Sequence, residues 1–182
     1  MFCKATLMDG AAMERALTRL AHQIVEKDPE VDSLCLVGIR TRGVPLARRL
    51  AANIRAVTGR EVPVGELDIT LYRDDLSAVA ETPVVSCSDI PFSVEGRTVV
   101  LCDDVIFTGR TARAAMDAVM ALGRPARIRL VTLIDRGHRE LPIYPDFIGK
   151  SIPTSRSEVV AVRLEETDGE TGVQLFENDN TN

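Results

Sequence analysis

Two adjacent carboxylates, Asp103 and Asp104, are followed after three apolar residues by a short polar loop, residues 108–111, Thr-Gly-Arg-Thr. Residues 98–102, ahead of the acids, are mostly β-branched and apolar without alternation, which is typical of a strand buried on both faces. After the loop, apolar residues recur at helical spacing: Ala112, Ala115, Met116 and Val119. Free backbone N–H groups and the positive end of the helix dipole would both face this loop. The stretch therefore predicts a phosphate site that follows two carboxylates.

Two other interpretations of the acidic pair compete with this one. The acids could simply solvate a sheet edge, or they could bind a metal as they do in receiver-type domains. A receiver needs a functional lysine downstream, and the one lysine beyond Asp104 is Lys150, in a loop-like Gly-Lys-Ser context. A receiver also does not account for Thr-Gly-Arg-Thr after the acids. The pattern favours a ligand site.

A second strand-to-helix loop has a similar character. Residues 33–38 indicate a short buried strand, and Pro45 suits the first position of a helix. The apolar face of this helix comprises Leu46, Leu50, Ile54 and Val57, and the helix ends at Gly59. The intervening Thr41-Arg42-Gly43 is a second candidate anion site. In an open parallel sheet the loops at the carboxyl ends of the strands lie together, so we expect both loops and Asp135–Arg139 to converge.

The first expected helix runs from an Asp9 cap to about Lys27. Its buried stripe is Met13, Leu17, Leu20 and Ile24, and a second, polar stripe comprises Arg15, Thr18, Arg19 and His22. A solvated surface is the plain interpretation of the polar stripe. Further strands are expected at 62–72, 129–134, 158–164 and 173–176, with residues 141–157 unpatterned and a polar tail at 178–182. Residues 73–89 form a long aperiodic loop, which in a compact domain is functional or mobile.

Composition narrows the class of protein. The chain has 182 residues, enough for one α/β domain, and a net charge of −5, which argues against coating nucleic acid by bulk attraction. No apolar run has the length of a membrane span and no signal sequence is evident, so we expect a cytoplasmic protein. The cysteines lack metal-ligand spacing and are expected to be reduced. Neither a nucleotide-triphosphatase loop nor a dinucleotide fingerprint is present.

The central stretch resembles a known family. Residues 99–111 are similar to the phosphoribosyl-pyrophosphate (PRPP) motif of type I phosphoribosyltransferases. Residues 68–76 and 135–143 resemble one branch, the bifunctional pyrimidine operon attenuation regulators and uracil phosphoribosyltransferases. The resemblance runs from about Lys4 to about Asp168. It implies a single domain, residues 1–182, with a central, mainly parallel sheet flanked by helices and a small C-terminal hood region.

The resemblance also implies an activity, the conversion of uracil and PRPP to UMP and pyrophosphate, and a role for each matching residue. Asp103 and Asp104 would hold the ribose hydroxyls, with Asp104 assisting proton loss from uracil. Thr41, Arg42 and Arg73 would take the pyrophosphate together with Mg²⁺, which would bind through PRPP and water. The family's pyrophosphate loop often has a strained peptide near the position of Thr41, and its loop matching 73–89 closes over PRPP. A surface ion pair with Asp74 or Asp75 is the alternative role for Arg73. The remaining implied substrate contacts are Val105, Ile106, Phe107, Thr108, Gly109, Arg110 and Thr111 around the 5′-phosphate, and Arg136 and Val160 beside the pyrimidine.

The family's second activity is RNA regulation. It senses UMP or UTP and binds the pyrimidine operon mRNA leader, as a homodimer or higher homo-oligomer. The residues that match its RNA face are Thr18, Arg19, His22, Arg40, His138, Arg139 and Lys150. One departure stands out: Tyr144 replaces a residue that is basic in much of the family, which removes a cation or supplies a stacking ring. The alternatives are a regulator with weak catalysis and a sister phosphoribosyltransferase without RNA binding.

Overall fold

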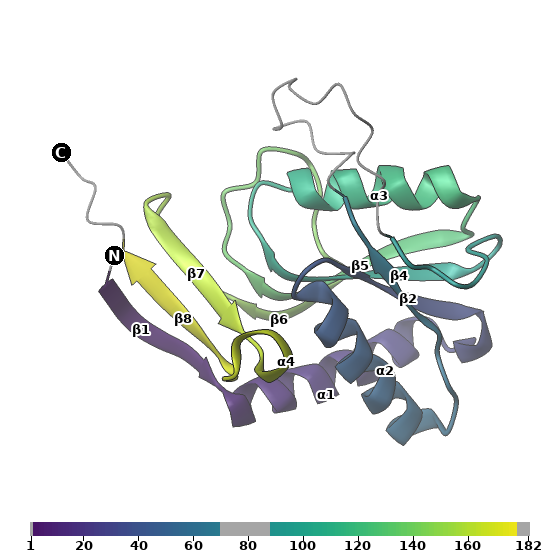
Figure 1. Ribbon diagram of the computed structural model, residues 1–182, viewed down its shortest axis with the longest axis horizontal. Coiled ribbons are helices and arrows are strands. Elements are labelled where there is room, and N and C mark those ends of the chain that lie inside the picture. Colours follow the sequence, from purple (N-terminus) through teal and green to yellow (C-terminus); the bar gives the residue numbers. More distant parts are fainter. Residues whose placement is uncertain (1, 70–87, 178–182) are drawn as a thin grey trace.

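The computed structural model describes residues 2–69 and 88–177 (Figure 1). Its helices are α1 (Gly10–Lys27), α2 (Gly43–Thr58), α3 (Arg110–Leu122) and α4 (Glu165–Asp168), with a short 3₁₀ turn at Val31–Ser33. Its strands are β1 (Phe2–Asp9), β2 (Leu34–Ile39), β3 (Val64–Leu67), β4 (Thr98–Ile106), β5 (Arg127–Asp135), β6 (Phe147–Ser151), β7 (Glu158–Arg163) and β8 (Gly172–Glu177).

The core of the fold is a five-stranded parallel sheet with the order β3-β2-β4-β5-β6. Figure 1 shows α1 and α2 on one face of this sheet and α3 on the other. Successive residues of the central strand alternate between the two layers: Val100 packs in the cluster with α1 and α2, whereas Val99 and Leu101 pack in the cluster with α3. The expected α/β class is confirmed, with the sheet buried on both faces as its unbroken apolar strands require.

Helix α1 forms where its local signals place it. The Asp9 carboxylate accepts a hydrogen bond from the Ala12 N–H at 2.7 Å, which caps the first turn. The four residues of the predicted apolar stripe are fully buried: Met13, Leu17, Leu20 and Ile24. The cap and the stripe were both read correctly from the sequence, so the start and the orientation of α1 are confirmed.

A second, smaller sheet of three antiparallel strands, in the order β1-β8-β7, forms the hood beside the main sheet (Figure 1). Strand β1 was not expected, because most of its residues are exposed and it lacks an apolar face that a sequence pattern would reveal. Strand β6 was also missed, since it is only five residues long and contains Gly149. Both strands lie at sheet edges, where burial constrains sequence least.

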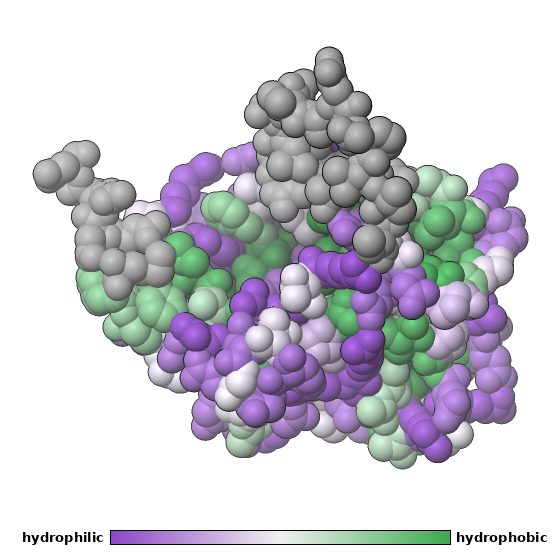
Figure 2. All heavy atoms as spheres, viewed as in Figure 1, coloured by the Kyte–Doolittle hydropathy of each residue, from purple (hydrophilic) through white to green (hydrophobic). Residues whose placement is uncertain are grey.

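Hydrophilic and hydrophobic residues are both visible on the surface of the molecule. Figure 2 shows hydrophilic residues over much of the face that α1 and α2 present, with hydrophobic residues visible both at the hood and around the main sheet. Phe2 of β1, in the hood, is 53% exposed. In the described part of the chain, no helix is both long enough and apolar enough to cross a membrane.

Candidate functional site

The acidic pair lies inside strand β4, near its carboxyl end. The sequence had instead indicated that the strand ends before the two acids. Strand β4 continues to Ile106 because its ladder with β5 continues, pairing Asp103 with Thr132 and Ile106 with Asp135. Both acids are half-buried at the carboxyl edge of the sheet. The ladder therefore holds the backbone of the two acids in place while their side chains face the site.

The environment of these carboxylates opposes their ionisation. Burial raises the pKa of Asp103 well above its ordinary value, and the neighbouring charge of Asp104 raises it further. Burial also raises the pKa of Asp104, against the opposing effects of the Val105 N–H, which donates to its carboxylate at 2.8 Å, and of the Arg42 charge. The Asp104 N–H in turn donates to Asp103 at 3.0 Å. A ligand that donates hydrogen bonds or carries positive charge would therefore stabilise the ionised form of this pair.

The loop after β4 turns sharply into helix α3. Gly109 has φ +94°, a left-handed conformation that favours glycine, and it precedes the helix as a cap without a side-chain hydrogen bond. The Arg110 N–H donates to the Thr108 hydroxyl at 3.3 Å. A cavity of about 320 Å³ opens here, and its walls include all of the expected phosphate loop, Thr108, Gly109, Arg110 and Thr111, together with Asp103, Val105, Ile106 and Phe107. The predicted phosphate loop and one predicted ribose acid thus line one cavity.

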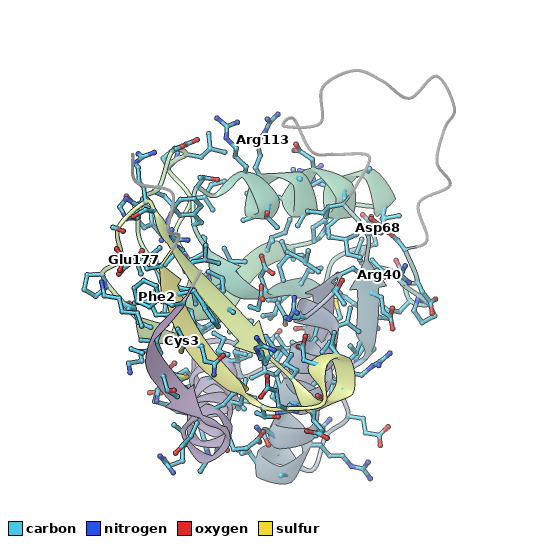
Figure 3. The ribbon with its side chains drawn as sticks, turned by 60° about the vertical axis from the view of Figure 1, so that its left-hand side comes forward. Phe2, Cys3, Arg40, Asp68, Arg113 and Glu177 are labelled. Carbon is cyan, nitrogen blue, oxygen red and sulfur yellow. The ribbon has the colours of Figure 1, made fainter. Side chains whose placement is uncertain are left out.

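A second cavity of about 430 Å³ lies on the other side of the acidic pair. It is lined by Asp103, Asp104, Arg40, Thr41, Asp68 and neighbouring apolar residues, and it shares Asp103, Val105 and Thr111 with the first cavity. The Arg40–Thr41 peptide bond is cis. Figure 3 shows Arg40 and Asp68 near one another at this side of the molecule, away from the hood residues Phe2 and Glu177.

The two loops meet because helix α2 begins directly against strand β4. A Cβ atom built on Gly43 would lie 2.2 Å from the Cys102 carbonyl oxygen, so a larger residue could not occupy this position. This close approach brings Thr41 and Arg42 to the acidic pair, as the sheet topology had predicted. The Arg42 guanidinium donates two hydrogen bonds to Asp168, the last residue of α4, at 2.7 and 3.1 Å. No local pattern in the sequence pointed to Asp168 as the partner of Arg42.

The expected pyrimidine-side residues lie between the main sheet and the hood. Arg136 is buried, with its guanidinium carbon 4.1 Å from the centre of the Phe107 ring. Its Nη2 donates to the Ser155 carbonyl at 2.8 Å and its Nε to the Thr154 hydroxyl at 3.2 Å. Burial lowers the pKa of Arg136. Val160 of β7 is half-buried and packs, like Val105, against the core cluster that joins the hood to the sheet.

Two residues that the sequence analysis passed over also line the first cavity. Glu140 accepts a hydrogen bond from Arg110 Nε at 3.1 Å. Thr132 is 1% exposed, and its hydroxyl has no hydrogen-bond partner among the residues that the structure describes. Neither has a sequence signal, since Thr132 reads as a buried strand residue and Glu140 as a surface acid. Both reach the cavity only through the sheet register and the loop that follows β5.

The residues expected on an RNA face fall into three groups. Thr18, Arg19 and His22 are exposed on α1, and Arg19 donates to the Gly149 carbonyl beside Lys150, whose Nζ donates to Leu7 O at 2.9 Å. Arg40 follows β2, toward the edge of the sheet opposite to β6, and pairs with Glu66 of β3 at 3.2 Å. His138 and Arg139 lie in the loop after β5. The structure therefore brings Arg19 together with Lys150 and leaves Arg40 apart from them.

Some expectations lie outside the described residues, namely Arg73 and the loop 73–89 up to residue 87. No group of three or more His, Cys, Asp or Glu side chains within 2–69 and 88–177 could hold a metal ion. Cys35 and Cys102 are buried free thiols, as expected, and burial raises the pKa of Cys35 to about 11.

Comparisons with known proteins agree with this geometry. Residues 5–167 match the family model described as "Phosphoribosyl transferase domain". The chain is 59% identical over 174 residues to the "Bifunctional protein PyrR" of Pelotomaculum thermopropionicum, covering 96% of each chain. It is 53% identical to the protein of that name from Deinococcus radiodurans, covering 96% of this chain and 95% of the relative. A hypoxanthine phosphoribosyltransferase of Trypanosoma cruzi superposes with a TM-score of 0.76 at 19% identity over 97% of this chain and 96% of that one, a likeness of fold alone.

Proposed function

This chain belongs to the PyrR family of phosphoribosyltransferases, and we propose that it transfers the phosphoribosyl group of PRPP to uracil and regulates pyrimidine genes by binding their mRNA leader. One observation carries the catalytic half: a single cavity of about 320 Å³ is lined by an anion-binding loop at a helix start and by Asp103 of a half-buried acidic pair. A phosphorylated sugar needs both features, one for its phosphate and one for its hydroxyls.

Displacement of pyrophosphate from the anomeric carbon builds positive charge on the ribose ring. In our proposal Asp103 and Asp104 accept the ribose hydroxyls and stabilise that charge, and Asp104 assists proton loss from uracil. Burial destabilises the ionised form of both acids and so raises their pKa. Positive charge on the ribose therefore stabilises these carboxylates more than it would stabilise exposed ones. Thr108–Thr111 hold the 5′-phosphate, and Val105, Ile106 and Phe107 form the adjoining wall.

The second cavity is the proposed place of the pyrophosphate. Thr41 lines it directly, and Arg42 lies close enough to Asp104 for each to shift the pKa of the other. Arg73 joins them in the proposal, at a position outside the described residues. Mg²⁺ would be held there through phosphate oxygens and water, the ligands that it prefers, and would help to neutralise the charge of the pyrophosphate. Arg136 and Val160 lie beside the pyrimidine, between sheet and hood.

The regulatory half of the proposal rests on family membership and on the α1–β6 surface. Thr18, Arg19 and His22 are exposed on one helix, and Arg19 lies beside Lys150, so the Arg19 and Lys150 cations can reach a phosphate backbone although the net charge is −5. Bound UMP or UTP strengthens RNA binding and PRPP opposes it. The working protein in this proposal is a single-domain chain, residues 1–182, in a cytoplasmic homodimer or larger homo-oligomer.

Two assays test the two halves. Release of pyrophosphate from PRPP with Mg²⁺ should depend on uracil, and release without any dependence on uracil would contradict the proposed reaction. Filter binding of a pyrimidine-operon leader hairpin should show a preference over a scrambled hairpin, strengthened by UMP. Arg19→Gln should weaken that binding and lower the salt slope by about one unit. Equal binding of leader and scrambled RNA would leave an enzyme without the regulatory role.

A further inference from the structure

The loop after β5 is built directly onto the loop expected to hold the 5′-phosphate. The Glu140 and Leu141 N–H groups both donate to the Thr108 carbonyl, at 2.9 and 3.1 Å. The Arg110 side chain donates to the Glu140 carboxylate at 3.1 Å. Gly109 faces the same loop, with Leu141 and Arg139 side-chain atoms 3.5 and 3.7 Å from the place where its Cβ would lie. Movement of either loop must therefore move the other.

The Arg139 side chain also joins the loop after β5 to the residues that precede the phosphate loop. Its Nη1 donates to the Phe107 carbonyl at 2.6 Å and its Nη2 to the Asp135 carboxylate at 2.7 Å. The side chain is only 9% exposed, and its Nε is buried with no hydrogen-bond partner among the described residues. The Tyr144 ring covers it, with the guanidinium carbon 5.4 Å from the ring centre. Both outer nitrogens of the guanidinium are thus engaged inside the protein.

We infer that Arg139 is a positioning residue that links the 5′-phosphate loop to the loop after β5, and that it is not a cation that contacts RNA. The inference rests on the proposed function, since it assigns a role within the coupling of UMP to RNA. Because the side chain is only 9% exposed, a full contact to an RNA phosphate would require Arg139 to leave Asp135 and Phe107. The half-buried Asp135 carboxylate would then lose its charged partner and keep only the Gly137 N–H at 2.9 Å. Its neighbour His138 lies in the same loop, with its Nε2 2.6 Å from the Thr154 carbonyl.

The coupling follows from shared ordering. A nucleotide phosphate that fixes Phe107–Arg110 also fixes the carbonyls to which Arg139, Glu140 and Leu141 are bonded. RNA binding to the loop after β5 then costs less conformational entropy of the protein. Bound RNA in turn favours nucleotide binding by the same factor. Arg139 is central to this route because its two hydrogen bonds join the end of β5 to the phosphate loop.

The test compares Arg139→Gln with two variants that remove the same charge. Arg19→Gln removes a proposed RNA contact, and Arg156→Gln removes an exposed arginine 3.7 Å from Glu140. For each, leader affinity is measured across a salt series with and without UMP. Arg139→Gln should leave the salt slope at its wild-type value and reduce the strengthening by UMP, which is on the order of tenfold for couplings of this kind. The effect is a reduction because the Glu140 and Leu141 hydrogen bonds to Thr108 remain. Arg19→Gln should lower the slope by about one and keep the UMP effect. Arg156→Gln should keep both near wild type.

A slope lowered by about one in Arg139→Gln, with the UMP effect intact, would show a direct RNA contact and overturn the inference. Asp135→Asn gives a second test that removes no cation. Loss of a negative charge alone should tighten RNA binding, whereas loosening of Arg139 should reduce the UMP effect at an unchanged slope. We expect the second result, and tighter binding with full UMP dependence would count against us. Asp135→Asn also serves if Arg139→Gln fails to fold.

An RNA-free measurement separates this inference from the proposed function. In hydrogen exchange, UMP should protect amides of both 107–111 and 138–141 in the wild type, and in Arg139→Gln the protection of 138–141 should be smaller while that of 107–111 is kept. Equal protection of 138–141 in both proteins would refute the link. If the wild-type protein showed no preference for the leader, the regulatory proposal would fail, yet this exchange experiment would still decide whether Arg139 joins the two loops.

Discussion

Arg42 and Asp168 form a two-point ion pair across 126 residues of chain, with Nη2–Oδ1 at 2.7 Å and Nε–Oδ2 at 3.1 Å. Asp168 Oδ2 also accepts the Leu164 N–H at 2.9 Å. The pair therefore joins the loop before α2, at the proposed pyrophosphate site, to the turn between β7 and β8. The hydrogen bonds from Arg42 lower the pKa of Asp168 and raise that of Arg42. The hood and the loop before α2 are in this way held as one unit.

Replacing Asp168 by Asn should lower the free energy of unfolding by about 1 kcal/mol at neutral pH, because a bidentate charged pair is lost. The Arg42 side chain is 36% exposed, so solvent screening keeps the effect this small. A carboxylate with a lowered folded pKa stabilises the fold above its unfolded pKa of about 3.9, and that stabilisation disappears as pH falls through the folded value. Denaturant unfolding at pH 7 and at pH 3 measures the difference.

The control for this experiment is Glu170→Gln in the same turn. Glu170 pairs with Arg163 at 2.8 Å, but it is 56% exposed, so its loss should change stability little. Equal destabilisation by the two variants, or a loss in Asp168→Asn that persists at low pH, would show that the pair does not stabilise the fold through its charge.

Asp104→Asn should lower the turnover of uracil phosphoribosylation on the order of a hundredfold while leaving the fold intact, because an electrostatic partner of the transition state is lost. Steady-state release of pyrophosphate measures the effect, and circular dichroism checks the fold. Asp32→Asn is the matched control, since Asp32 is 72% exposed and pairs with Arg60. Near wild-type turnover in the double variant of Asp103 and Asp104 would remove the acidic pair from the mechanism.

Asp103→Asn should make the protein more stable while it abolishes activity. Burial raises the folded pKa of Asp103, so its ionised form is disfavoured in the native state and its cost grows as pH rises through and beyond the unfolded pKa of about 3.9. An amide keeps the hydrogen bond from the Asp104 N–H and carries no charge. We expect a gain of about 1 kcal/mol at pH 7 that vanishes near pH 3. A variant less stable than wild type at pH 7 would mean that the carboxylate is held by stabilising contacts.

Most of the central sheet could be predicted, because its signals are local. The buried strands are continuous apolar runs, α1 has its own cap and stripe, and the Thr-Gly-Arg-Thr loop identifies the start of α3 within two residues. The convergence of the loops around Asp103 followed from parallel topology alone. The edge strands β1 and β6 escaped because short, exposed edge strands carry little hydrophobic pattern.

The side-chain partners could not be predicted, because they depend on contacts distant in sequence. Arg42 was expected to face a pyrophosphate, and nothing near it in sequence pointed to Asp168. Arg139 had been placed on an RNA face by the family resemblance, and the fold sets its guanidinium against Asp135 and Phe107. Composition indicates which residues are cations, and only the fold shows which of them are already paired.

Tyr144, which by the family resemblance is expected to replace a basic residue, gives a final prediction. It is 72% exposed, and its ring lies over the Arg139 guanidinium at 5.4 Å. A ring in this place screens Arg139 from water and adds a cation–π contact, which at exposed sites is worth about 0.5–1 kcal/mol. Tyr144→Phe keeps the ring and should leave both leader binding and its UMP dependence unchanged.

Tyr144→Arg should separate the two consequences of this departure from the family pattern. The added cation should tighten leader binding and steepen its salt dependence by about one unit. The second guanidinium beside Arg139 should at the same time loosen the link between the loops and reduce the strengthening by UMP. Filter binding across a salt series, with and without UMP, measures both. If Tyr144→Phe alone weakened leader binding at an unchanged UMP effect, the hydroxyl would be an RNA contact and the ring would not act through Arg139.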